Sequence, residues 1–130
     1  MIYLSDIRDW LKTVSNAEHY YIGKLDNKQE RSLGAYSLKQ SGAPVRAIGT
    51  DSTYSTVSVS LLLHWSNNAK ETEQEARHLF ETLYNIKDVV INEHKIYIIE
   101  LLTPEPVDVG TDDKGVYEQV IEVKFYYERK

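Results

Sequence analysis

The clearest pattern along the chain is the alternation of apolar and polar residues between Tyr54 and Trp65. Every second residue from Val57 to Trp65 is apolar, and the residues between them are polar except for Leu62. Side chains alternate between the two faces of a β-strand, so this segment predicts a long strand with one face in the core. The same period recurs in Gly115–Arg129 and predicts a long last strand with one buried and one solvent-exposed face.

Apolar residues recur at helical spacing in two segments, residues 2–14 and 67–85. Each segment predicts an amphipathic helix that packs one face on the core. Ser5 or Asp6 is expected to cap the first helix, and the Asn-Asn pair at residues 67–68 to cap the second. The apolar stripes are Ile7, Trp10, Leu11 and Val14 in the first helix, and Ala69, Thr72, Ala76, Leu79, Phe80 and Leu83 in the second.

Shorter apolar segments complete the expected sheet. His19–Leu25 and Leu33–Lys39 are interpreted as two strands of a hairpin, and Asp88–Asn92 and Lys95–Leu102 as two strands of another. Lys95–Leu102 is apolar on both faces, so we expect it to be a central strand. Two helices on one face of a largely antiparallel mixed sheet make an α+β fold. We expect a single domain spanning residues 1–130.

Composition narrows the possible functions. The 130 residues are 42% hydrophobic and 27% charged, which is typical of a soluble globular domain. The chain has no cysteine, which excludes disulfides, thiolate metal sites and a cysteine nucleophile and fits a reducing cytoplasm. The N-terminal segment carries Asp6 and no long apolar run, so we expect neither a signal peptide nor a membrane span.

The net charge of −5 argues against a nucleic-acid partner, because tight binders gather positive charge to neutralise phosphates. A loose basic cluster, Lys24, Lys28 and Arg31, is diluted by Asp26 and Glu30. We therefore expect no sequence-specific nucleic-acid binding, and the three basic residues stand as secondary contact candidates.

Two polar segments are candidate contact loops. Gln40–Thr53 contains two glycines and a proline, and Pro104–Lys114 joins two apolar segments yet is rich in proline and acids. Loops this long in a compact domain tend to be functional or disordered. Gly110 and Gly115 are expected at positive-φ positions. The candidate contact residues are Arg46 and Asp51 in the first loop, and Asp108, Gly110, Asp112, Asp113, Gly115 and Tyr117 in and after the second.

The acidic segment is a poor match to a metal loop. Counted from Asp108, a calcium loop would need an oxygen ligand at the third position, glycine at the sixth and glutamate at the twelfth, and all three fail. A site made by Asp108, Asp112 and Asp113 is the minor alternative. His64 ends a predicted strand and is expected at the surface or a sheet edge rather than as a ligand. The chain has no phosphate-binding glycine motif and no nucleophile elbow, so we expect no catalytic residue, metal or cofactor.

The ten tyrosines leave two interpretations open. Tyrosine has an apolar body and a polar tip, and it is enriched at interfaces. Adjacent pairs such as Tyr20/Tyr21 and Tyr126/Tyr127 point to opposite faces of a strand, so some of them must face solvent or a partner. The alternative is that tyrosine simply suits strands.

The last quarter of the chain, TPEPVDVGTDDKGVYEQVIEVKFYYE, resembles the minor capsid and tail terminator proteins of long-tailed bacteriophages and their prophages. That family shows a proline-containing stretch, then G-x-D-x-x-G, an aromatic residue and an alternating last strand. Gly110, Asp112, Gly115 and Tyr117 match this pattern. The upstream order, a helix, a strand ending at Gly23, a long alternating strand and an acidic helix, also resembles the family across nearly the whole chain.

The resemblance implies a virion assembly protein located in the tail or neck, and in the host cytoplasm during assembly. Such subunits close into a hexameric ring that caps the tail tube, stops its polymerisation and meets the head connector. The expected partners are the protein itself, the tail tube protein and the head connector or stopper, with no membrane partner. A head-completion or stopper protein of the same virion is one alternative. A bacterial small-molecule-binding α+β module is another, and an enzyme comes last.

Overall fold

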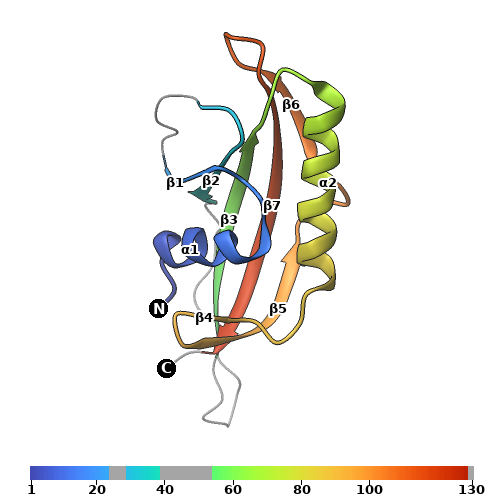
Figure 1. The fold of residues 1–130 in the computed structure, drawn as a ribbon. Coiled ribbons are helices and arrows are strands. Elements are labelled where there is room, and N and C mark those ends of the chain that lie inside the picture. The colour runs from blue at the N-terminus through green and yellow to red at the C-terminus, as the bar shows by residue number, and fades with distance from the viewer. Residues whose placement is uncertain (24–28, 39–53, 129–130) are drawn as a thin grey trace.

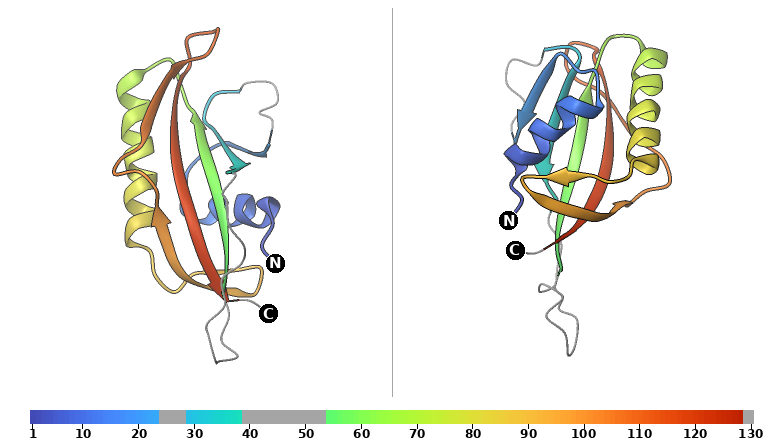
Figure 2. Two further views of the ribbon diagram at one scale, coloured as in Figure 1. Left: turned by 180° about the vertical axis from the view of Figure 1, so that it is seen from behind. Right: turned by 60° about the horizontal axis from the view of Figure 1, so that its bottom comes forward.

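The computed structural model of the protein describes residues 1–23, 29–38 and 54–128. The helices are α1 (Leu4–Val14) and α2 (Ala69–Asn85), and the strands are β1 (His19–Ile22), β2 (Ser32–Ser37), β3 (Tyr54–His64), β4 (Val90–Ile91), β5 (His94–Leu101), β6 (Val107–Thr111) and β7 (Tyr117–Glu128). Both helices lie on one face of a curled sheet (Figure 1). Seen from behind, β3 and β7 have no helix in front of them (Figure 2).

The seven described strands form one mixed sheet in the order β1-β2-β3-β7-β5-β4, and β6 pairs with β7 beyond this path. β3 and β7 pair antiparallel over their whole lengths, from Tyr54 opposite Glu128 to His64 opposite Glu118. β5 and β6 share the other edge of β7. The predicted α+β class, with a largely antiparallel sheet and two helices on one face, is confirmed.

The core lies between the helices and one face of the sheet. The alternation in β3 and β7 places Val59 opposite Val123 and Leu61 opposite Ile121, and all four side chains are fully buried. Helix α2 adds Leu79 and Leu83 to this layer, and α1 adds Ile7 and Leu11. Each fully buried aliphatic side chain contributes about 1.5–3 kcal/mol to folding, so the two long strands anchor the domain. The ring of Trp10 on α1 meets Phe125 edge-on, with 5.7 Å between the centroids.

The helix starts follow the expected capping chemistry at one helix and differ at the other. In α2, the Oδ1 atom of Asn68 accepts a hydrogen bond from the Glu71 N–H at 3.1 Å, which confirms the cap at residues 67–68. Helix α1 begins at Leu4, so the expected cap at Ser5 or Asp6 was wrong. Asp6 lies inside the first turn, where its Oδ2 accepts from the Tyr3 N–H at 2.8 Å.

The first predicted hairpin is wrong, because β1 and β2 are parallel, with His19 opposite Ser32. The prediction assumed that two neighbouring strands joined by a polar segment fold back on each other. Nine residues, 23–31, separate the two strands, and this is more than the two to five residues of a usual hairpin loop. The second predicted hairpin, β4 and β5, is confirmed as antiparallel.

The position expected for the Lys95–Leu102 strand is also wrong. β5 pairs with β7 on one side, but on its other side β4 contributes only the pairs with His94 and Lys95. Tyr97 and Ile98 are 51% and 58% exposed. An apolar pattern on both faces did not bury this strand.

The acidic segment between β5 and β7 contains a strand that the sequence did not predict. β6 occupies Val107–Thr111 within the expected loop Pro104–Lys114 and pairs antiparallel with the first part of β7. Prolines before it and Gly110 within it are typical of loops, and all five of its residues are exposed, so no burial pattern reveals it.

Candidate contact surface

The segment from Val107 to Val116 forms an exposed strand and a turn at one end of the molecule (Figure 1). Gly110 has φ +90° at a bulge, where the register of β6 against β7 shifts, and Gly115 has φ +81° in the turn. Both predicted positive-φ glycines are confirmed. A left-handed backbone conformation costs a residue with a Cβ about 1–2 kcal/mol, so glycine is the favoured residue at both of these positions.

Asp112 holds the β6–β7 turn, Asp112–Val116, in shape. Its Oδ1 atom accepts hydrogen bonds from the N–H groups of Lys114 at 2.8 Å and Val116 at 3.0 Å. The Gly115 N–H also donates to the Asp112 carbonyl at 3.1 Å. Asp108 acts similarly at the bulge, where its Oδ1 accepts from the Gly110 N–H at 2.8 Å. These two carboxylates therefore stabilise the backbone of the bulge and of the turn.

The other oxygen of Asp112 faces His64, the last residue of β3. The Nε2 atom of His64 lies 3.5 Å from Asp112 Oδ2, and its Nδ1 lies 2.9 Å from Glu118 Oε2. An ionised carboxylate only accepts hydrogen bonds, so the His64 Nδ1–H donates to Glu118. The His64 side chain is fully buried, and those of Asp112 and Glu118 are 7% and 19% exposed.

The surface position expected for His64 is wrong. Strand alternation correctly places it on the face away from the helices, but the β6–β7 turn covers that end of the face. The Trp65 N–H donates to the Tyr117 carbonyl at 3.1 Å, and the Tyr117 N–H donates to the Ser66 carbonyl at 2.8 Å. These bonds hold the residues after β3 against the first residue of β7, and the imidazole contacts both the turn, at Asp112, and β7, at Glu118.

The structure gathers several of the sequence candidates at this end of the molecule. Asp113 and Gly115 are exposed, and Tyr117 is half-buried. Arg31 joins them, because its N–H donates to the Trp65 carbonyl at 2.7 Å. The Arg31 guanidinium is about half exposed and lies 3.1 Å from the Glu71 carboxylate, a surface pair worth at most about 1 kcal/mol. Arg46, Asp51, Lys24 and Lys28 lie outside the described residues.

Five exposed apolar side chains lie on the strands beyond β7, and the sequence did not predict their exposure. Val90 on β4, Tyr97 and Ile98 on β5, and Val107 and Val109 on β6 are each between 42% and 60% exposed. An apolar segment alone could not reveal this, because exposure depends on which strand edges remain unpaired.

The tyrosines divide between the two interpretations. Tyr127 is buried in the core at 4% exposure, whereas Tyr97 is exposed. Tyr126 is half-buried on the face without helices, where its ring contacts Tyr54 and its hydroxyl donates to Glu100. Strand propensity accounts for Tyr127, and the exposure of Tyr97 fits either interpretation.

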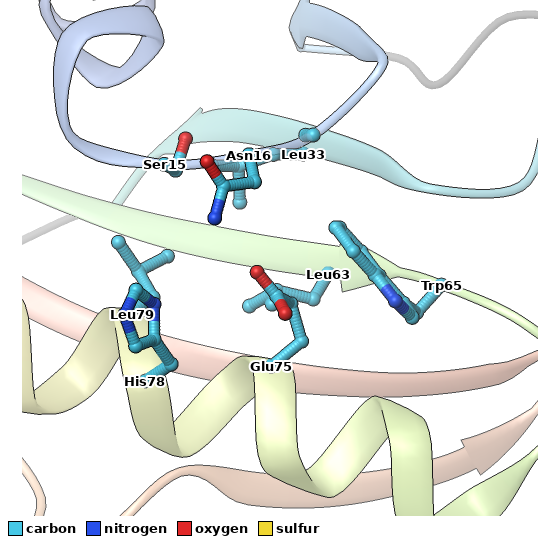
Figure 3. Close-up of a pocket in the computed structure, with 9 residues that line it drawn as sticks. Ser15, Asn16, Leu33, Leu63, Trp65, Glu75, His78 and Leu79 are labelled. Atoms are coloured by element: carbon cyan, nitrogen blue, oxygen red, sulfur yellow. The ribbon is translucent and has the colours of Figure 1, made fainter.

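A crevice lies between α2 and the connection from α1 to β1 (Figure 3). Asn16, Glu75 and His78 contribute its polar groups, and Leu63 and Trp65 its apolar wall. Its volume of about 10 Å³ has room for about one water molecule. A small-molecule site between helix and sheet would be far larger, at about 300–1,000 Å³, so this crevice gives that function no support.

A second, larger hollow follows β5. It has a volume of about 370 Å³ and lies between residues 86–89, which follow α2, and residues 95–99. Lys87, Asp88 and Lys95 supply charge, and Tyr97 and Ile98 supply apolar surface. Its volume lies at the lower end of the range for small-molecule sites, but consecutive residues of one strand line it together with residues 86–89, and not polar groups that converge from a helix and the sheet.

Within residues 1–23, 29–38 and 54–128, no three histidine or acidic side chains lie close enough together to hold a metal ion. Neither helix in this part of the chain is long and apolar enough to cross a membrane.

Comparison with known proteins gives one result. A family model described as bacteriophage tail terminator protein matches residues 3–129. The match spans every helix and strand named above. No curated protein matches the sequence.

Proposed function

Because the chain belongs to the bacteriophage tail terminator family, we propose that it forms a ring that caps the tail tube, stops tube polymerisation and joins the tail to the head connector. Membership places the protein in the virion tail among other tail components, in a structural rather than an enzymatic family. Formation of the ring, capping of the tail tube and attachment to the head connector are what we propose beyond family membership. Its main support is a family match over almost the whole chain, combined with an exposed, internally braced contact surface.

The surface that we assign to the tail tube is β6 together with the β6–β7 turn. Val107 and Val109 expose apolar side chains at 42% and 50%, and the turn carries the exposed Asp113. The hydrogen bonds of Asp112 and the contact with His64 fix this surface before any partner arrives. A pre-organised surface loses less conformational entropy on binding, so it binds more tightly for the same contacts.

The remaining contact candidates enter the proposal on different grounds. Arg31 lies at the same end as Tyr117, so it belongs to the same surface. Arg46, Asp51, Lys24 and Lys28 are proposed as contacts from the sequence alone. The net charge of −5 suits a channel through which DNA must pass without sticking, because like charges repel.

The tube-contact surface is tested by replacing its two valines with charged residues. Tail assembly in cells that produce Val107→Asp/Val109→Asp should give overlong tubes without heads, because charge cannot be buried against the tube. A control is Tyr3→Asp, which adds one aspartate near α1 at a side chain that is 59% exposed. Control tails should have normal length and carry heads in electron micrographs.

Normal capping by the double valine variant would show that β6 does not contact the tail tube. Tails of normal length that lack heads would instead favour a neck or stopper role, since termination would then not depend on this surface. Folding of both variants is checked by circular dichroism, and little change is expected because the three side chains are exposed.

A further inference from the structure

β5 has the composition of a central strand, yet one of its edges is open. On that side, the described residues give it only Val90 and Ile91 of β4, and the last bond is from the Ile96 N–H to the Val89 carbonyl at 2.9 Å. Beyond Ile96, no described strand pairs with this edge. An open edge with apolar side chains is a template for another strand.

The neighbouring strand β6 is better protected against strand addition than β5. Pro104 and Pro106 precede β6, Asp108 lies within it, and a bulge at Gly110 bends it. Prolines, charges and bulges are the usual means of blocking strand addition at an edge. β5 has a bulge of its own between Ile96 and Ile98, but its pairing with β7 is regular from Ile98 to Leu101. Ile98 and Ile99 carry neither charge nor proline, so addition is expected at this regular part of the strand.

The opposite end of the sheet is β1. It pairs only with β2 in the described part of the chain, and Ile22 at its end is 40% exposed. β1 is parallel to β2, and the sheet then reverses direction three times, at β3, β7 and β5. β1 and β5 therefore run in opposite directions at the two ends of one sheet.

We propose that β1 of a second copy adds antiparallel to β5, in the hollow beside residues 86–89, and so continues the sheet from subunit to subunit. This inference rests on the proposed ring and names its subunit contact. Because the two edges are different surfaces, the contact is head-to-tail, and a contact of that kind closes into a ring when its rotation closes. Both helices lie on one face of the sheet, so α2 of one copy comes beside α1 of the next (Figure 1).

Backbone hydrogen bonds define the register. The N–H groups of His19 and Gly23 donate toward β2, to Arg31 and Ala35, so those of Tyr20 and Ile22 point to the open edge. Beside β5, the Leu102 N–H donates to the Glu122 carbonyl of β7. By the same alternation, the N–H groups of Ile99 and Leu101 point away from β7, toward the open edge. Tyr20 opposite Ile99 is then a hydrogen-bonded pair.

Side chains agree with this register. Tyr21 comes opposite Ile98 on the face without helices, so its ring can cover the Ile98 side chain, which is 58% exposed. His19 comes opposite Glu100 on that same outer face, where an imidazole N–H can donate to the carboxylate. Both the backbone alternation and the side-chain match therefore favour the same pairing.

The absence of native cysteine makes cross-linking a direct test. Tyr21 and Ile98 flank the hydrogen-bonded pair, so they form a non-hydrogen-bonded pair with Cα atoms about 4.5 Å apart, which suits a disulfide. The double variant Tyr21→Cys/Ile98→Cys should give, after oxidation, a ladder of covalent multimers on a non-reducing gel. Tyr21→Cys/Lys114→Cys, whose second cysteine lies in the distant turn, is the matched control and should stay monomeric.

The same samples distinguish the two proposals. Light scattering before oxidation gives the mass in solution, and purified tails show whether the protein is incorporated. Rings or tail-bound protein without the ladder would overturn the β1–β5 contact and leave the proposed function standing. Protein that neither forms rings nor joins tails would overturn the proposed function, and the β1–β5 contact with it.

Discussion

The buried histidine at the end of β3 provides the sharpest test of how the β6–β7 turn is held. In His64→Ala, the imidazole between Asp112 and Glu118 is lost, and two largely buried carboxylates are left facing each other. We expect the variant to fold but with lower stability and a looser turn.

The magnitude follows from the contacts. A hydrogen bond to a charged group is worth about 1.5–3 kcal/mol, and His64 Nδ1 makes one to Glu118 at 2.9 Å. Leaving a buried charged partner without its hydrogen bond costs more again, but Glu118 is 19% exposed and can gain water. We therefore expect a loss of about 3 kcal/mol, or a fall of about 10 °C in Tm for a domain of this size.

Urea denaturation and thermal unfolding followed by circular dichroism measure this loss. His78→Ala is the matched control, because His78 is exposed on α2, and it should change stability by less than about 0.5 kcal/mol. The double variant His64→Ala/Asp112→Asn should lose less than the sum of the two single variants, since the two residues share one contact. A His64→Ala variant as stable as the control would refute the bracing role.

Two further predictions concern backbone and capping. Gly110→Ala should lower stability by about 1 kcal/mol, because φ +90° strains any residue with a Cβ, and hydrogen exchange should rise in β6; unchanged exchange would contradict the bulge. Asn68→Ala should cost about 1 kcal/mol in urea denaturation through loss of the bond to the Glu71 N–H, whereas Asn67→Ala should cost little, and equal losses would contradict the assigned cap.

Local pattern predicted the two long strands and both helices, because their burial repeats along consecutive residues. Val57 to Trp65 and Tyr117 to Tyr127 show the period of a half-buried strand, and the structure places them side by side at the centre. The acidic helix was also predicted with its cap, since capping depends on residues only three apart.

Features that depend on distant segments were not predictable in the same way. The parallel pairing of β1 with β2 depends on the return path between them, which has no local signature. The burial of His64 depends on a turn 48 residues further along the chain, counted from residue 64 to 112. The apolar pattern of β5 predicted a central strand. In the assembly that we propose, β1 of the next subunit pairs with β5, and β5 then lies between two strands.

Tail length in the absence of this protein tests the central claim most directly. Electron micrographs of tails assembled in cells that lack the chain should show tubes of variable, excessive length without heads. Supplying the chain from a plasmid should restore one length and head attachment. Tails of uniform, normal length in the absence of the chain would contradict the account, because polymerisation would then end without this protein.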